Sequence, residues 1–142
     1  MQMTRQPDVL FVCVHNAGRS QMAKALFNWI AEERGLKLWA DSAGTISSDR
    51  VHPEVVTAMG ELGIDVSHEQ PKLLTDDMLA GRPRVFTMGC AVDSEACPSL
   101  RLEDVVDWGL PDPKGRPLEE VREIRDEIKR RVEGVLAEMA RV

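Results

Sequence analysis

The fold class is indicated most clearly by residues 8–30, Asp8-Val-Leu-Phe-Val-Cys13-Val-His-Asn-Ala-Gly-Arg19-Ser-Gln-Met-Ala-Lys-Ala-Leu-Phe-Asn-Trp-Ile30. It opens with a continuous apolar run, residues 8–13, which is typical of a strand buried on both faces of a parallel sheet. A short loop with Asn and Gly follows, and a helical pattern then continues until Gly35 ends it. The apolar positions of that pattern are Met22, Ala23, Leu26, Phe27 and Ile30. A strand, a tight loop and a helix in this order predict the first unit of an α/β fold.

The alternation continues along the chain. We expect further strands at residues 36–40, 84–88 and 103–108, and helices at 53–63, 75–81 and 117–141. The Asp41-Ser-Ala-Gly44 stretch is interpreted as a turn. The sequence thus predicts a single domain over residues 1–142, with a four-stranded, mostly parallel sheet and helices on both faces. Ligands in such folds bind at the carboxyl ends of the strands, so the loop after the first strand is the first candidate site.

Composition narrows the function. The chain has 142 residues, a formal charge of -6 and a pI of about 5.1, which argue against nucleic acid or an anionic membrane as a partner. The apolar run at residues 9–14 is too short for a signal peptide or a membrane span, so we expect a cytoplasmic protein. Three cysteines cannot close a disulfide framework, because one thiol is always left over. Redox or nucleophilic chemistry is the leading use for them.

The loop after the first strand carries a cysteine and an arginine with five residues between them, Cys13 and Arg19. Backbone N–H groups of a tight loop and of a helix start can converge on a tetrahedral oxyanion, and an arginine can bind two of its oxygens. The same field should favour a thiolate at Cys13. The alternative is a buried structural cysteine beside an exposed arginine. The predicted oxyanion-binding residues are Val14, His15, Asn16, Ala17, Gly18, Arg19 and Ser20.

The segment Cys13-Val-His-Asn-Ala-Gly-Arg-Ser-Gln-Met-Ala23 resembles the opening of arsenate reductases related to low-molecular-weight protein tyrosine phosphatases. Three further segments fall in the family's order: Asp41-Ser-Ala-Gly44, Gly63-Ile-Asp65 and Trp108-Gly-Leu-Pro-Asp-Pro113. The resemblance covers almost the whole chain. It implies that Cys13 is the nucleophile, Asn16 shapes the loop, Arg19 clamps the oxyanion, Ser20 contacts the thiolate and Asp112 is the general acid.

Two more cysteines, Cys90 and Cys97, lie in the loop after the predicted strand 84–88. The resemblance to the thioredoxin-coupled reductases implies a relay in which Cys90 attacks the sulfur of Cys13 after arsenate has bound to it, and Cys97 then attacks Cys90. Thioredoxin would reduce the resulting disulfide as an external reductant, and no bound cofactor is expected. If residues 90–97 were helical, their ends would be about 10 Å apart, beyond the roughly 7 Å limit for a disulfide, so the segment must rearrange during turnover.

Other interpretations remain open. A zinc site fits poorly, because the six-residue gap between Cys90 and Cys97 differs from the usual ligand spacing, and the histidines His15, His52 and His68 show none. A protein tyrosine phosphatase, a mycothiol-dependent arsenate reductase and a non-enzymatic anion-binding protein are the alternatives. The chain has no tyrosine to line a phosphotyrosine groove. A large aryl substrate is therefore poorly served, and the resemblance implies arsenate as the substrate, with phosphate and sulfate as oxyanion mimics.

Overall fold

The computed structural model describes residues 6–46, 48–89 and 105–140. Four strands form one sheet in the order β2-β1-β3-β4, and all three pairings are parallel. The strands are β1 (Val9–Cys13), β2 (Ala40–Gly44), β3 (Arg84–Thr87) and β4 (Val105–Asp107); the helices are α1 (Arg19–Glu33), α2 (Pro53–Gly60), α3 (Asp76–Leu79) and α4 (Leu118–Met139). The predicted fold class is confirmed. No described helix is long and apolar enough to cross a membrane.

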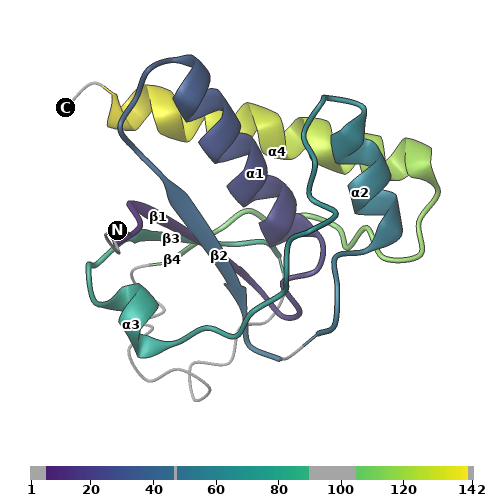
Figure 1. The fold of residues 1–142 in the computed structure, drawn as a ribbon, viewed down its shortest axis with the longest axis horizontal. Coiled ribbons are helices and arrows are strands. Elements are labelled where there is room, and N and C mark those ends of the chain that lie inside the picture. Colours follow the sequence, from purple (N-terminus) through teal and green to yellow (C-terminus); the bar gives the residue numbers. More distant parts are fainter. Residues whose placement is uncertain (1–5, 47, 90–104, 141–142) are drawn as a thin grey trace.

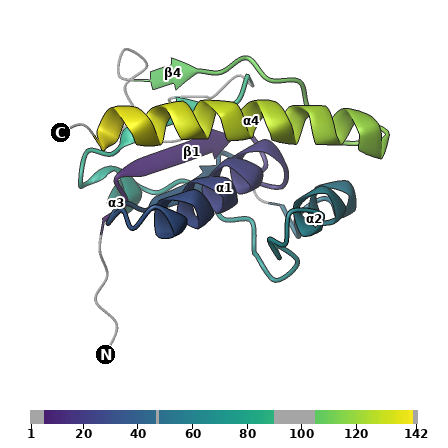
Figure 2. The same ribbon diagram turned by 90° about the horizontal axis from the view of Figure 1, so that it is seen from above.

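Helices cover both faces of the sheet unequally. Alternate side chains of β1 point to opposite faces, so Phe11 packs in the larger core with α1, α2 and α4, whereas Leu10 packs in a smaller core with Met78 and Leu79 of α3. Figure 1 shows α1, α2 and α4 on one side of the sheet and α3 on the other. From above, α1 and α4 lie side by side with α2 beyond one end (Figure 2). All five residues of β1 are buried, which explains its continuous apolar sequence.

The second strand corrects the sequence-based prediction. Residues 36–40 were expected as the strand and 41–44 as a turn, but β2 runs from Ala40 to Gly44. Its polar residues suggested a turn, yet parallel pairing with β1 buries them, with Gly44 opposite Cys13. Asn28 fixes the start of the strand, because its side-chain amide donates to the Ala40 carbonyl at 3.0 Å and accepts from the Ala40 N–H at 2.8 Å.

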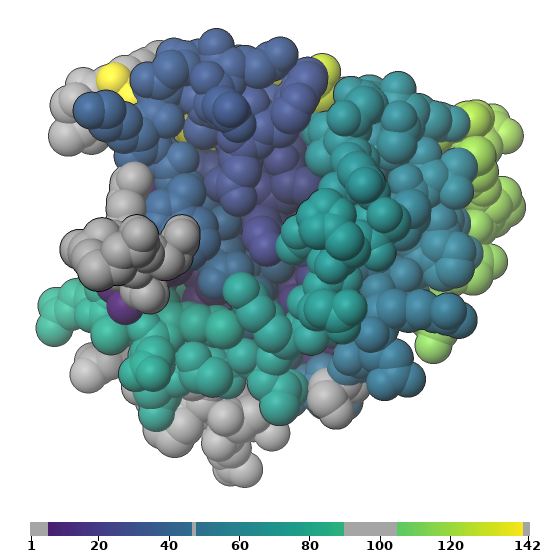
Figure 3. Space-filling view, in the orientation of Figure 1, coloured from purple at the N-terminus to yellow at the C-terminus, as the bar shows by residue number. Residues whose placement is uncertain are grey.

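The end of β2 lies against the loop after β1. A Cβ added at Gly44 would lie 2.6 Å from the carbonyl oxygen of Val14 and 2.9 Å from the backbone nitrogen of Asn16. Glycine is therefore required here by space, since any side chain would displace this loop. In the space-filling view, β1 is covered by β2 and by the segment between α2 and α3, so little of β1 reaches the surface (Figure 3).

Candidate active site

The loop between β1 and α1 is held by one buried asparagine. Asn16 adopts a left-handed backbone with φ 55°, a conformation that Asn tolerates better than most residues. Its side-chain oxygen accepts hydrogen bonds from the Lys72 backbone N–H at 3.0 Å and from Gln21 Nε2 at 3.1 Å. Its side-chain nitrogen donates to Ser20 Oγ at 2.8 Å. Asn16 therefore ties the loop to the segment before α3 and to the first turn of α1.

The sulfur of Cys13 lies inside this network. The backbone N–H of Asn16 donates to Cys13 Sγ at 3.2 Å, and Ser20 Oγ lies 2.8 Å from the same sulfur. Because Asn16 already donates to the Ser20 hydroxyl, the hydroxyl proton of Ser20 is free to point at the sulfur. Two donors directed at one buried sulfur suit a thiolate nucleophile.

Arg19, the first residue of α1, is anchored from behind. Its Nη1 donates to the carbonyls of Met88 at 2.9 Å and Leu110 at 2.7 Å, which lie after β3 and β4. A guanidinium has five N–H groups, so the three on Nε and Nη2 remain for a ligand. Among the described residues, no carboxylate lies within 4.0 Å of an Arg19 nitrogen. The arginine is thus a fixed, buried cation without a described counter-ion.

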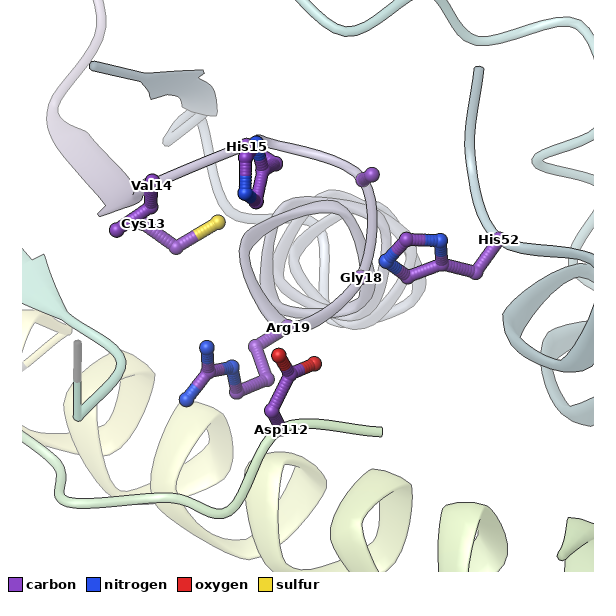
Figure 4. A pocket seen from close by; sticks show the side chains of 8 residues that line it. Cys13, Val14, His15, Gly18, Arg19, His52 and Asp112 are labelled. Carbon is purple, nitrogen blue, oxygen red and sulfur yellow. The ribbon is translucent and has the colours of Figure 1, made fainter. Parts of the chain in front are cut away.

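These groups surround a pocket of about 180 Å³ at the carboxyl end of β1 (Figure 4). A water molecule occupies about 30 Å³ of liquid, so the pocket has room for a tetrahedral oxyanion and a few waters. Asn16 and Ser20, two of the predicted oxyanion-binding residues, are fully buried and do not line this pocket; each contacts the sulfur of Cys13, and their side chains contact each other. The lining residues are Cys13, Val14, His15, Ala17, Gly18, Arg19, His52 and Asp112.

Asp112 reaches the pocket from the segment between β4 and α4. In Figure 4 its carboxylate lies beside Arg19 and faces the space in front of the loop. Its Oδ1 accepts a hydrogen bond from the Lys114 backbone N–H at 3.0 Å, which orients the carboxyl group. A thiolate, an anion cradle and a carboxyl group that can supply a proton are the parts needed for nucleophilic displacement on a tetrahedral oxyanion.

His52, for which the sequence analysis found no role, also lines the pocket. It stands immediately before α2, and its backbone N–H donates to the carbonyl of Ala17 at 2.8 Å. Burial is the main cause that lowers the pKa of His52, and it outweighs the opposing effect of the Glu54 and Asp112 carboxylates. His52 is far from Cys13 in the sequence and matches no spacing rule, so packing alone brings the two together.

The predicted redox cysteines, Cys90 and Cys97, lie outside the described residues. The described chain before them ends at Gly89, directly after the carbonyl of Met88 that accepts from Arg19. The backbone N–H of Gly89 donates to Asp107 Oδ1 at 2.7 Å, which fixes this point next to the end of β4. Among the described residues, no group of three His, Cys, Asp or Glu side chains could hold a metal ion.

Comparison with known proteins agrees with this geometry. Residues 8–142 match the family model of the low molecular weight phosphotyrosine protein phosphatases. A Halobacterium salinarum protein with a provisional arsenate reductase name is 45% identical over 86% of this chain and 85% of its own length. Arsenate reductase 1 of Staphylococcus epidermidis is 33% identical over 88% of this chain and 92% of its own.

Solved structures fall into two groups. A mutant of YwlE from Bacillus subtilis superposes with a TM-score of 0.82 at 27% identity, over 95% of this chain and 99% of that one, and a second YwlE structure is named an arginine phosphatase. An arsenate reductase in its phosphate-binding state superposes with a TM-score of 0.78 at 34% identity, over 94% of this chain and 98% of that one. Phosphatases and arsenate reductases thus share this scaffold.

Proposed function

The chain belongs to the low molecular weight phosphotyrosine protein phosphatase family. Because relatives in the comparison are named arsenate reductase, we propose that the chain is an arsenate reductase with Cys13 as its nucleophile. The observation that carries the proposal is the Cys13 sulfur, which receives two hydrogen-bond donors and faces an anchored Arg19 across a small pocket. The relatives named arsenate reductase, at 33% and 45% identity, support this choice of substrate.

In the first step, arsenate binds to the backbone N–H groups of the loop and to the free N–H groups of Arg19. The Cys13 thiolate attacks arsenic, so an S–As bond forms while the As–O bond on the opposite side breaks. Asp112 gives its proton to the departing hydroxyl, which leaves as water. The product is an arsenate esterified on the Cys13 sulfur, with arsenic still in its +5 state.

The second step requires another thiol. Cys90 attacks the Cys13 sulfur, a disulfide forms, the S–As bond breaks and its electron pair reduces arsenic to arsenite. Cys97 then attacks Cys90, which frees Cys13 and leaves a Cys90–Cys97 disulfide for thioredoxin to reduce. The described chain ends at Gly89, and Cys90 is the next residue in the sequence. This chain connection, together with the bond from Arg19 to Met88, supports Cys90 as the attacking thiol.

A phosphatase is the second candidate, because a phosphate ester would undergo the same first step and YwlE superposes with the high TM-score of 0.82. The two functions differ in the second step, which is hydrolysis in a phosphatase. The pocket of about 180 Å³ has room for the tetrahedral oxyanion that the first step of both functions needs, so the second step is what distinguishes them.

Cysteine variants test the relay in an assay that contains arsenate, thioredoxin, thioredoxin reductase and NADPH. We expect Cys97→Ser to release about one equivalent of arsenite and stall as a Cys13–Cys90 disulfide, because the next thiol in line is missing. Cys90→Ser and Cys13→Ser should release none. Peptide mass spectrometry identifies the joined pair.

Other outcomes contradict parts of the proposal. Repeated turnover of Cys97→Ser with thioredoxin makes Cys97 dispensable, and turnover of that variant with mycothiol alone replaces the thioredoxin route. Hydrolysis of aryl phosphate at a rate comparable to arsenate reduction by the unmodified protein favours the phosphatase. Substantial arsenate reduction by Cys13→Ser rules out the mechanism.

A further inference from the structure

The imidazole of His52 is fixed at the side of the pocket. Its backbone N–H donates to Ala17, and a Cβ added at Gly18 would lie 3.2 Å from His52 Cδ2 and 3.0 Å from Pro113 Cγ. The ring and the proline therefore pack against Gly18 from two directions. In Figure 4 the ring points into the pocket with a nitrogen foremost, from the side opposite Cys13.

The charged and titratable groups around His52 come from three segments. Glu54 lies in the first turn of α2, Asp112 and Lys114 follow β4, and His15 belongs to the anion loop. The two carboxylates raise the pKa of His52, while Lys114, His15 and, above all, burial lower it. The net effect lowers the pKa of His52, which favours the neutral ring with one N–H donor and one nitrogen acceptor.

The atom of the substrate that comes nearest to this ring follows from the direction of attack. The oxygen that leaves is opposite the Cys13 sulfur, on the open side of the pocket where Asp112 and His52 stand. In hydrogen arsenate this atom is a hydroxyl, which both donates and accepts a hydrogen bond. In a phosphate monoester it carries a carbon substituent, which has no proton to donate and needs space.

We propose that His52 is a specificity-determining residue, which hydrogen-bonds the outer hydroxyl of a free tetrahedral oxyanion and occupies the space that an ester substituent would need. A neutral imidazole suits a hydroxyl, because each can donate to and accept from the other. The proposal deepens the arsenate reductase function and rests on it. It assigns the choice between inorganic oxyanion and ester to a side chain outside the anion loop.

Binding measurements without turnover test the proposal. In a Cys13→Ser background, calorimetry compares the affinities for arsenate and phenyl phosphate in protein with His52, His52→Ala or His52→Asn. We expect His52→Ala to weaken arsenate binding roughly tenfold, as the loss of one hydrogen bond to a charged ligand predicts. Phenyl phosphate should bind equally well or more tightly. The affinity of the His52→Asn variant for arsenate should lie between those of the proteins with His52 and with His52→Ala, because asparagine keeps a donor and an acceptor.

The matched control is His68→Ala. His68 is exposed and lies near the carboxylates of Asp65 and Glu69, away from the pocket lining, so both affinities should stay the same. Equal losses for arsenate and phenyl phosphate in His52→Ala would show a merely structural residue. Unchanged affinities for both would also overturn the proposal. These results do not depend on turnover, so they stand apart from a failure of arsenate reduction in the unmodified protein.

The pH dependence of sulfate binding gives a second readout. Sulfate keeps its double negative charge across the range of about pH 5 to 8 in which histidine titrates. As the pH falls through the lowered pKa of His52, the ring gains a positive charge and sulfate should bind more tightly. In the Cys13→Ser background, the His52→Asn variant should lack this part of the increase. Identical pH profiles for the two proteins would contradict a direct contact.

Discussion

Two buried arginines, one in each of the two longest helices, begin alike. Arg19 in α1 is 9% exposed and Arg125 in α4 is 8% exposed. Each directs Nη1 at backbone carbonyls: Arg19 at Met88 and Leu110, and Arg125 at Ala58, 2.8 Å away. These bonds fix the position of each guanidinium and link its helix to another part of the chain. Burial and backbone anchoring therefore do not distinguish them.

The two arginines differ in their counter-ions. Arg125 is 2.9 Å from Glu61 and 2.9 Å from Asp126, so two carboxylates balance its charge. Arg19 has no carboxylate within 4.0 Å among the described residues, although removing a charge from water without a partner is costly. A buried cation that is anchored but not neutralised marks a site where an anion binds, whereas the neutralised arginine holds two helices together.

The largest expected effect tests whether Asp112 serves as the counter-ion of Arg19. If Asp112 is instead a proton donor, Asp112→Asn should slow the first chemical step about 10²-fold or more, because general acid catalysis typically contributes that much. Phosphate should bind with an affinity within about threefold of normal, since an amide leaves the anion cradle intact. Rapid-quench measurement of adduct formation and calorimetry with phosphate give the two values. Lost binding with unchanged chemistry would make Asp112 a structural partner of Arg19.

The second prediction exchanges the two arginines for lysine. Arg19→Lys should weaken phosphate binding about 100-fold, because the ammonium group of lysine cannot hydrogen-bond two carbonyls and two oxyanion oxygens at once. Arg125→Lys, the matched control, should change the affinity less than twofold. Calorimetry with phosphate measures both. Equal weakening in the two variants would show that buried charge in general, rather than the anion site, controls binding.

The third prediction concerns stability, for which Arg125 should matter more than Arg19. Arg125→Met should lower the free energy of unfolding by about 2 kcal/mol, since it removes charge-assisted hydrogen bonds between α2 and α4. Arg19→Met should cost less than about 1 kcal/mol, because it also removes an unbalanced buried charge. Phosphate should stabilise the Arg125 variant but not the Arg19 variant against urea. A larger loss from Arg19→Met would contradict the assigned roles.

Sequence patterns predicted the elements whose signals are local. β1 and α1 follow from an apolar run and a 3.6-residue period, and their junction predicted the position of the anion loop. β2 was wrong by four residues because Asp41 and Ser42 are polar, yet lie buried in the sheet. Pairing partners far along the chain decide such a strand. The strand propensity of the local sequence does not reveal these pairing partners.

The same limit applies to the site. Cys13 and Arg19 are six positions apart and could be paired by spacing, and the resemblance to a family supplied Asp112. His52 enters the pocket only because its backbone bonds to Ala17 and its ring packs on Gly18. Such tertiary contacts leave no periodic trace in the sequence.

The smallest expected effect concerns the ion pairs of Glu61 with Arg122 and Arg125, in which the Glu61 side chain is 33% exposed. The side-chain hydrogen bond from Arg122 is the main cause, followed by Arg125, that lowers the pKa of Glu61 from 4.5 to about 2. A lowered carboxyl pKa contributes stability that is present above pH 4.5 and is lost as the pH falls towards 2. In urea unfolding, Glu61→Gln should therefore be less stable than the unmodified protein at pH 7, by a small margin that shrinks as the pH falls below 4.5. A double-mutant cycle with Arg122→Gln isolates this pair, and its coupling energy should decline over the same pH interval. A coupling that does not change with pH would show that Glu61 acts through packing, and the contrast with the un-neutralised Arg19 would then rest on shape rather than on charge.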